Sequence, residues 1–229
     1  DARLKSERMK TDLITNVSHD LKTPLTAIVS YVDLLKKEEL GNDAAVGYVD
    51  VLDRQATRLK KLTEDLVEAS KASSGTLSVN LAPTGVSEVL GQSLGEYAAR
   101  LESAELTVIA GEPDADARVR ADGRLLWRVF DNLLGNVVKY SMPGTRVYVD
   151  VRRQNGKTEV RIKNISRDAL NIAASELTER FVRGDASRST DGSGLGLSIA
   201  KSLVELMGGE FGIEIDGDLF TAIVRLVDA

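Results

Sequence analysis

Several residue types are scarce in this chain of 229 residues, and each absence excludes a class of protein. There is no cysteine, which excludes a disulfide framework and thiolate chemistry and is typical of a reducing compartment. The single histidine excludes a metal site built from several His and Cys ligands. No run approaches the ~18 apolar residues that a membrane-spanning helix needs. Aromatic residues make up only 4%, so aliphatic side chains must supply the core.

The residues that are abundant indicate a folded protein. Hydrophobic residues make up 42% and charged residues 28%, which is enough apolar surface to bury a core. The 30 basic and 35 acidic residues give a formal charge of −5, which argues against nucleic acid as a partner. We expect no signal peptide, because residues 1–10 have a charged helical pattern that indicates a longer helix continuing upstream.

Residues 1–75 contain only three of the 19 glycines and have the pattern of two long helices. Apolar residues recur at steps of three and four, which is a heptad seam on each helix. The first seam comprises Ile14, Val17, Leu21, Pro24, Ile28, Tyr31 and Leu35, and the second comprises Val49, Leu52, Ala56, Leu59, Leu62 and Leu66. Two helices alone cannot enclose a core, so we expect two copies to form a dimeric four-helix bundle. A long intramolecular coiled coil is the less favoured alternative.

Residues 76–229 alternate between strand and helix patterns, which predicts an α/β sandwich. Asn155-Gly156 predicts a hairpin turn, and Gly208-Gly209 predicts a helix end. The expected strands cover residues 77–81, 106–109, 147–151, 160–162, 211–215 and 219–226, and the expected helices cover 86–104, 122–140 and 195–207. We therefore place a domain boundary at residue 75.

The only histidine, His19, falls on the outer face of its predicted helix, at heptad position f if Ile14 is position a. Thr23 shares this face at i+4, Asp20 is adjacent, and Pro24 interrupts the helix one turn later. A lone surface histidine is usually inert. A neutral imidazole beside a carboxylate and a hydroxyl, however, is a competent nucleophile for accepting a phosphoryl group.

Two features of the second half could hold a nucleotide. Asn132, Asn136 and Lys139 share one helix face, and an amide oxygen in such a place either caps neighbouring backbone or ligates Mg²⁺. The run from Gly192 to Leu197 precedes a helix, so its backbone N–H groups and the helix N-terminus could bind phosphates. Such a glycine run is also found in flexible turns, and by itself it is a weak signal.

These motifs together closely resemble those of bacterial sensor histidine kinases, over essentially the whole chain. The matching segments are Asn16–Leu25 (H box), Asp131–Ser141 (N box), Phe181–Ser189 (F box and ATP lid) and Gly192–Leu197 (G2 box). The resemblance implies a dimerisation and histidine-phosphotransfer domain over residues 1–75. It also implies a catalytic ATP-binding domain of the Bergerat type over residues 76–229. The expected protein is an ATP-dependent protein-histidine kinase.

The resemblance also implies a role for individual residues. His19 is the expected phosphoacceptor, Asp20 its base or orienting group, and Thr23 a residue of a phosphatase activity. Asn136 is the expected Mg²⁺ ligand. The expected ATP contacts are Asn132, Asn136, Lys139, Tyr140, Asn164, Arg183, Arg188, Gly192, Gly194, Leu195, Gly196 and Leu197.

The resemblance implies partners as well. They are a second copy of the chain and a response regulator whose aspartate receives the phosphoryl group. We expect a cytoplasmic portion of a protein that reaches the membrane only through upstream segments.

One motif departs from the family pattern. The family has Asp-x-Gly-x-Gly, whose Asp accepts a hydrogen bond from the adenine amino group, where this chain has Asn164-Ile165-Ser166. An Asn oxygen can still accept that bond without charge assistance, so we favour retained ATP binding. The departure keeps open a pseudokinase scaffold that binds nucleotide and partner without efficient turnover. A Bergerat-fold ATPase or protein-serine kinase is a third alternative, which the H box disfavours.

Overall fold

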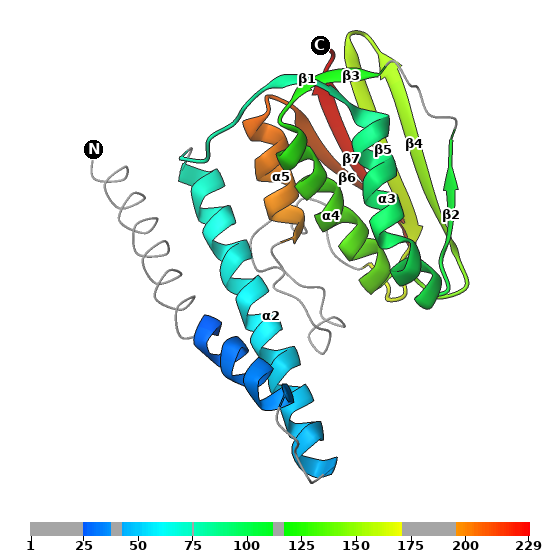
Figure 1. Ribbon diagram of the computed structural model, residues 1–229. Coiled ribbons are helices and arrows are strands. Elements are labelled where there is room, and N and C mark those ends of the chain that lie inside the picture. Colours follow the sequence, from blue (N-terminus) through cyan, green and yellow to red (C-terminus); the bar gives the residue numbers. More distant parts are fainter. Residues whose placement is uncertain (1–24, 38–42, 75, 112–116, 171–195) are drawn as a thin grey trace. The chain divides into compact units, whose positions relative to one another are not determined.

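The heptad pattern of the first 75 residues forms two helices in the computed structural model, which describes residues 25–37, 43–74, 76–111, 117–170 and 196–229. One helix covers residues 25–37, and α2 (Asp43–Ser74) returns antiparallel to it (Figure 1). The Lys36 ammonium and the Asp53 carboxylate join them at 2.6 Å. This hairpin belongs to the first of two compact units, Asp1–Leu77 and Ser78–Ala229. The expected boundary at residue 75 lies two residues before that division.

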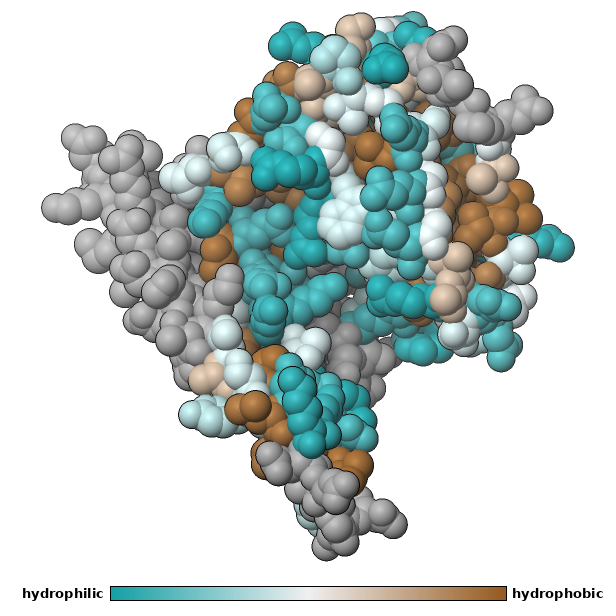
Figure 2. All heavy atoms as spheres, viewed as in Figure 1, coloured by the Kyte–Doolittle hydropathy of each residue, from teal (hydrophilic) through white to brown (hydrophobic). Residues whose placement is uncertain are grey.

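The hairpin buries only part of the two predicted seams. Val49 and Ala56 of the second seam are buried. On the first helix the buried residues are Leu25 and Val32, which are not members of the predicted first seam. Other large apolar side chains remain exposed, and in Figure 2 brown atoms of this hairpin lie at the surface among teal ones. The exposed members of the seams are Ile28, Tyr31, Leu35, Leu52 and Leu59. The seam positions before residue 25 lie outside the described residues. One chain therefore leaves an apolar face of this hairpin in contact with water.

The second unit is an α/β sandwich, as the alternating pattern predicted. A five-stranded sheet has the order β2-β4-β5-β7-β6, and its neighbouring strands are antiparallel except for the parallel pair β2–β4. Three helices cover one face of this sheet (Figure 1). The strands are β2 (Thr107–Ala110), β4 (Arg146–Gln154), β5 (Lys157–Ile165), β6 (Glu210–Asp216) and β7 (Leu219–Val227), and the helices are α3 (Val86–Ser103), α4 (Gly123–Tyr140) and α5 (Gly196–Leu206).

The two faces of the sheet follow the period-2 pattern of its strands. On the face toward the helices, here called the inner face, apolar residues such as Val149, Ile162 and Ala222 pair across neighbouring strands and are buried. The opposite face carries ion pairs between strands, including Arg161 with Glu214 at 2.7 Å. Within the described ranges, no helix combines the length and the apolar character needed to cross a bilayer.

The local turn signals predicted from sequence are confirmed. Asn155 and Gly156 have φ values of 54° and 73°, which is the left-handed turn that an Asn-Gly hairpin adopts between β4 and β5. The α5 helix ends at Gly208, where φ is 76° and the Gly209 N–H donates back to the Val204 carbonyl at 2.9 Å. This is the helix ending that the glycine pair indicated.

One predicted strand is wrong, and two short strands were missed. Residues 77–81 alternate in polarity but form no strand, because no ladder partner lies beside them. A strand begins instead at Ala82. This strand, β1 (Ala82–Gly85), pairs with β3 (Arg118–Ala121) in a two-stranded sheet. Pro83 is tolerated there because a strand of such a ribbon has a free edge that needs no N–H donor.

A buried carboxylate begins α4. Asp122 is buried and is the N-cap of α4, where it accepts the N–H groups of Arg124 and Leu125. Its second oxygen accepts the Asn80 N–H at 3.0 Å, which fixes the chain entering the unit. Burial opposes ionisation of Asp122. The hydrogen bonds from Asn80, the Arg124 side chain and the helix N–H groups outweigh it and lower the pKa of this carboxyl.

Asp122→Ala should destabilise the second unit by about 2–4 kcal/mol, because it removes an N-cap and leaves the Asn80 N–H without its acceptor. Urea unfolding followed by the fluorescence of Trp127, the one tryptophan, measures this change. A folded-state pKa below the usual 3.8 stabilises the protein above that value, and the stabilisation is lost as pH falls through the folded pKa. The difference in the free energy of unfolding between Asp122→Ala and the unsubstituted protein should therefore shrink below about pH 4. The exposed Asp216→Ala serves as control; an equal loss there would contradict the assignment.

Candidate functional site

The α4 helix is divided between a buried face and a polar one. Its apolar side chains pack into the core, including Leu126, Val129, Phe130, Leu133 and Leu134. The predicted site residues Asn132, Asn136 and Lys139 lie on the other side of the helix and are half-buried. Because the apolar face fixes the rotation of α4, it also fixes the direction in which these polar groups point.

The first residue of α5 lies against both asparagines. A methyl group built on Gly196 would lie 3.3 Å from Oδ1 of Asn132 and 3.6 Å from Oδ1 of Asn136. The Asn132 amide nitrogen donates to the Arg128 carbonyl at 2.8 Å, which leaves its oxygen toward α5. The Asn136 side chain makes no hydrogen bond to any residue that the structure describes. A methyl group at 196 would therefore be tight against the Asn132 oxygen and in ordinary van der Waals contact with the Asn136 oxygen.

This arrangement fits a metal-bound polyphosphate. Amide oxygens are ligands that Mg²⁺ accepts, and Asn136 has no other described partner for its oxygen. The N-terminus of α5 offers N–H groups and a partial positive charge to phosphate oxygens. Among the described residues, no group of three or more His, Cys, Asp or Glu side chains gathers to hold a metal. A metal in such a site would have the Asn136 amide as one ligand, with phosphates and water as others.

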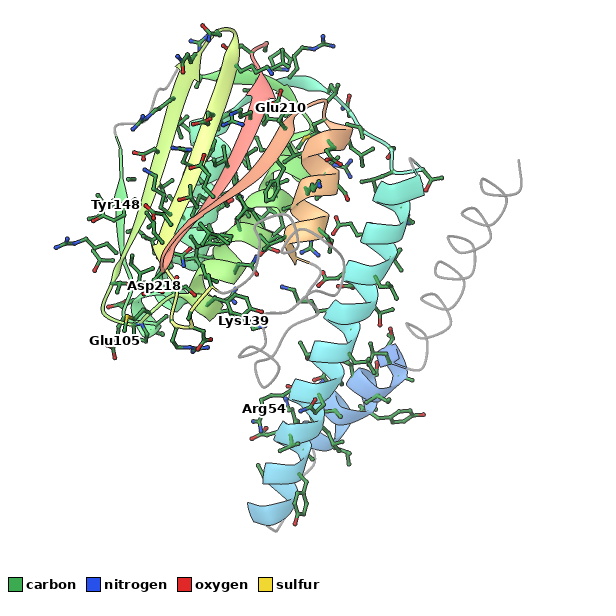
Figure 3. All side chains as sticks on the ribbon, turned by 180° about the vertical axis from the view of Figure 1, so that it is seen from behind. Arg54, Glu105, Lys139, Tyr148, Glu210 and Asp218 are labelled. Carbon is green, nitrogen blue, oxygen red and sulfur yellow. The ribbon has the colours of Figure 1, made fainter. Side chains whose placement is uncertain are left out.

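The end of α4 is joined to the end of β5. The Met142 N–H donates to the Ile165 carbonyl and the Arg167 N–H donates to the Tyr140 carbonyl, both at 2.9 Å. The Lys139 ammonium lies 4.7 Å from the centre of the Tyr140 ring. Figure 3 shows Lys139 and the β6–β7 turn residue Asp218 at one end of the unit and Glu210 at the other. The structure thus brings Tyr140 and the end of β5 together.

Asn164 lies at this end of β5, on the inner face of the sheet. It is 4% exposed and lies opposite Phe220 of β7. Its amide nitrogen is 3.5 Å from the Ile165 carbonyl, a contact at the outer limit for a hydrogen bond. Its oxygen accepts no hydrogen bond from any described residue. The adenine contact expected of Asn164 therefore stays a prediction. It is supported by the burial of this amide and by the lack of a strong hydrogen bond that would fix its orientation.

Sequence reasoning missed the residues that brace α4. The Tyr97 hydroxyl on α3 donates to the Asp131 carboxylate at 2.6 Å, and Arg128 holds the other carboxylate oxygen at 2.8 Å. Burial and the adjacent Asp131 raise the pKa of Tyr97 to about 12. Because Asp131 is the only carboxylate of α4 and is fully engaged, it orients the helix beside Asn132. No local pattern indicates this contact, since it depends on how α3 packs on α4.

The remaining predicted site residues are not all described. Leu197 is half-buried in the first turn of α5, next to Gly196. The others lie outside the described residues; they are His19, Asp20, Thr23, Arg183, Arg188, Gly192, Gly194 and Leu195.

Comparison with known families agrees with this geometry. Residues 121–227 match the family described as histidine kinase-, DNA gyrase B- and HSP90-like ATPase. Residues 9–75 match the His Kinase A (phospho-acceptor) domain. The second unit is thus an ATPase domain of the histidine kinase type, preceded by a phospho-acceptor domain. Together the two domains are those of a two-component sensor histidine kinase core, as the motifs predicted.

Curated relatives are sensor proteins that are longer than this chain. The sensor protein VanSC of Enterococcus gallinarum is 31% identical over 98% of this chain and 63% of its own length. The sensor protein DivL of Caulobacter vibrioides is 30% identical over 96% of this chain and 28% of its own length. The chain therefore spans less than two thirds of these relatives.

Solved structures share the fold. The mycobacterial sensor histidine kinase MprB is 28% identical with a TM-score of 0.55, over 65% of this chain and 98% of that one. Full-length ShkA in complex with AMPPNP superposes with a TM-score of 0.81 over 95% of this chain and 46% of that one. Its sequence is 23% identical, so it supports the fold alone.

Gly196→Ala should weaken ATP binding by about threefold to tenfold, because the new methyl group would lie 3.3 Å from the Asn132 oxygen and push that amide away from α5, while Asn136 stays at ordinary contact distance. Calorimetric titration of Mg-ATP into the full chain measures this loss. The matched control is Gly95→Ala in α3, where a methyl group meets nothing within 4 Å. The control should bind ATP normally and gain up to about 1 kcal/mol of stability. Equal affinity in both variants would show that α5 does not approach the asparagines closely.

Proposed function

We propose that this chain is an ATP-dependent protein-histidine kinase. It phosphorylates His19 from Mg-ATP and passes the phosphoryl group to an aspartate of a response regulator. The observation that carries the proposal is the approach of Gly196, at the N-terminus of α5, to the oxygens of Asn132 and Asn136. The phospho-acceptor family match over residues 9–75 supplies the acceptor, and it contains the one histidine of the chain.

The nucleotide end of this reaction is built from neutral and cationic groups. Asn136 would ligate Mg²⁺, with Asn132 beside it and Lys139 one turn further along α4. When bound, Mg²⁺ neutralises charge on the phosphates and lowers the cost of transfer. The one carboxylate of α4, Asp131, is held by Tyr97 and Arg128 and cannot activate water. These features favour transfer to a protein acceptor over hydrolysis.

At the acceptor end, an imidazole nitrogen of His19 attacks the γ-phosphorus of ATP. The bond from that phosphorus to the bridging oxygen breaks, and ADP leaves. Asp20 takes the imidazole proton or orients the ring, so the product is a phosphoramidate. Thr23, four residues after His19, would act in the phosphatase reaction, which removes the phosphoryl group from the aspartate of the partner regulator. The family matches and the fitting asparagines favour this kinase over a scaffold without turnover.

His19→Gln should abolish acid-labile phosphorylation, because no other histidine can carry the label. The ATP dissociation constant should stay within about twofold, since nucleotide binding rests on Asn132, Asn136 and α5. Incubation with γ-labelled ATP, followed by acid and base treatment, measures the label. Lys22→Gln, in the same segment but without an assigned role, should still be labelled. Residual acid-labile, base-stable label in His19→Gln would refute the proposal.

The apolar face that the hairpin leaves exposed supports a second proposal, that the partner of this hairpin is a second copy of the chain. Tyr31, Leu52 and Leu59 are 68%, 51% and 45% exposed. They belong to the heptad seams, of which Val49 and Ala56 are already buried and Ile28 and Leu35 are exposed as well. A symmetric four-helix bundle would remove these side chains from water.

Leu59→Asp should shift the full chain from dimer to monomer, because it places a carboxylate from each copy in an apolar interface. The dimer dissociation constant should rise by at least about 100-fold. Sedimentation equilibrium measures the change. Thr57→Asp, also exposed on α2 but on the side of the helix opposite Leu59, adds the same charge outside this face and should leave the dimer intact. A wild-type chain that is monomeric at micromolar concentration would contradict the assembly.

The location of the protein is also a proposal. The relatives are sensor proteins of greater length. We place this core on the cytoplasmic side of the membrane, attached through segments outside this sequence. ATP and the response regulator would reach it there.

A further inference from the structure

Two buried polar side chains lie next to the proposed nucleotide site without a complete set of hydrogen bonds. Ser141, directly after α4, is 5% exposed. Its hydroxyl oxygen is one of two buried side-chain atoms in the described part of the chain that have no hydrogen-bond partner. The Asn164 oxygen accepts no bond from a described residue and the side chain is 4% exposed. A buried hydroxyl such as that of Ser141 is normally satisfied, so a group from outside the chain is expected to meet it.

The backbone places these two side chains on the same face. Ser141 and Ser166 form an antiparallel bridge, flanked by the bonds from Met142 N to Ile165 O and from Arg167 N to Tyr140 O. That is the non-hydrogen-bonded type of pair, whose Cα atoms lie about 4.5 Å apart with both side chains on one face. Asn164 precedes Ser166 by two residues and shares that face. Ser141 and Asn164 are therefore diagonal neighbours, with Cα atoms about 7–8 Å apart.

Ser141 and Asn164 lie at a distance from the proposed phosphate contacts that suits the base of a nucleoside triphosphate. Ser141 follows Asn136 by five residues, which is about 7.5 Å of helix rise, and follows Asn132 by nine, about 13.5 Å. A nucleoside triphosphate whose phosphates meet Asn132, Asn136 and α5 would extend its base toward the end of α4. The Ser141 and Asn164 side chains are polar groups that lie there on the inner face.

Both side chains are neutral and can donate as well as accept. A hydroxyl rotates, and an amide presents either its oxygen or its NH₂ group. The one contact of the Asn164 amide is 3.5 Å long, too weak to lock its orientation. A carboxylate at this place could only accept. It would bind the 6-amino group of adenine and repel the 6-oxo group of guanine, whereas an amide can turn to meet either.

We propose that Asn164 and Ser141 form a base-recognition pair that accepts guanine as well as adenine, so that the chain binds GTP in addition to ATP. This rests on the proposed function, because it places the base of the phosphoryl donor at the end of α4. Ser141 contacts the base directly or through one ordered water. A polar site of this kind offers the hydrogen-bond partners that such a water needs. The 6-position of the purine, amino or oxo, meets the Asn164 amide.

Calorimetric titration of the full 229-residue chain with Mg-ATP, Mg-GTP and magnesium tripolyphosphate tests the proposal. The dissociation constants for ATP and GTP should lie within about fivefold of each other. Asn164→Asp should tighten ATP and weaken GTP, so that the ratio moves by at least about tenfold, because a hydrogen bond to a charged group is the stronger one. Tripolyphosphate has no base, so its affinity should not change.

Ser141→Ala separates a base contact from a structural role. It should weaken ATP and GTP alike by about twofold to tenfold and leave tripolyphosphate unaffected. Its stability to urea should not fall, because replacing an unsatisfied buried hydroxyl by a methyl group is neutral or favourable. The matched control is Ser93→Ala, whose buried hydroxyl donates to the Val89 carbonyl at 2.9 Å and lies on α3. This control should bind all three ligands as the unsubstituted chain does.

Each remaining outcome would overturn the proposal in a distinguishable way. If ATP binds and GTP is more than about 100-fold weaker, base recognition is selective, and the kinase proposal stands without this one. If Ser141→Ala binds both nucleotides normally, Ser141 is not a base contact and the pair is wrong. If neither nucleotide nor tripolyphosphate binds, the proposed function fails together with the inference.

Discussion

The packing of α4 on the sheet is the constraint on which the site depends. Phe130, Leu134 and other apolar residues of this helix are fully buried, so the helix can take only one rotation about its axis. That rotation turns Asn132 and Asn136 toward α5 and brings the end of α4 to the end of β5. The buried Asp122 cap fixes where the helix begins, and the Tyr97–Asp131 contact fixes it against α3. A shift of α4 would therefore move the phosphate end and the base end of the site together.

Among the described residues, the two carboxylates of α4 and its N-cap are engaged by hydrogen-bond donors and bring no free negative charge to the candidate site. Asp122 and Asp131 are both on or beside α4, and both are held by N–H, O–H or guanidinium donors. Several other ion pairs of the unit lie on the outer face of the sheet, as between Arg225 and Glu159 at 2.6 Å. A polyphosphate would thus meet amides, a lysine and a helix N-terminus, an environment that attracts anions. The same neutrality at Asn164 and Ser141 removes the charge that would select one base.

The apolar residues of the helical hairpin fall into a buried set and an exposed set. A heptad seam has two sets of positions, and a single antiparallel pair of helices buries one of them. Val49 and Ala56 are buried in the chain, whereas Leu52 and Leu59 remain exposed. This division follows from geometry, because two cylinders touch along one line and each seam is wider than that line. The exposed set is what a bundle of four helices would enclose.

The sequence by itself determined the features that depend on neighbouring residues. The Asn155-Gly156 turn, the helix end at Gly208 and the Asp122 start of α4 each follow from local backbone preferences, and the motifs identified the family. Only the tertiary structure decided which residues pair at a distance. The strand expected at residues 77–81 lacks a partner, and β1 forms instead because β3, more than 30 residues later, lies beside it. The same holds for the Tyr97–Asp131 contact and for the burial of Ser141, because hydrogen-bond satisfaction is a property of the packed chain and no short pattern of residues encodes it.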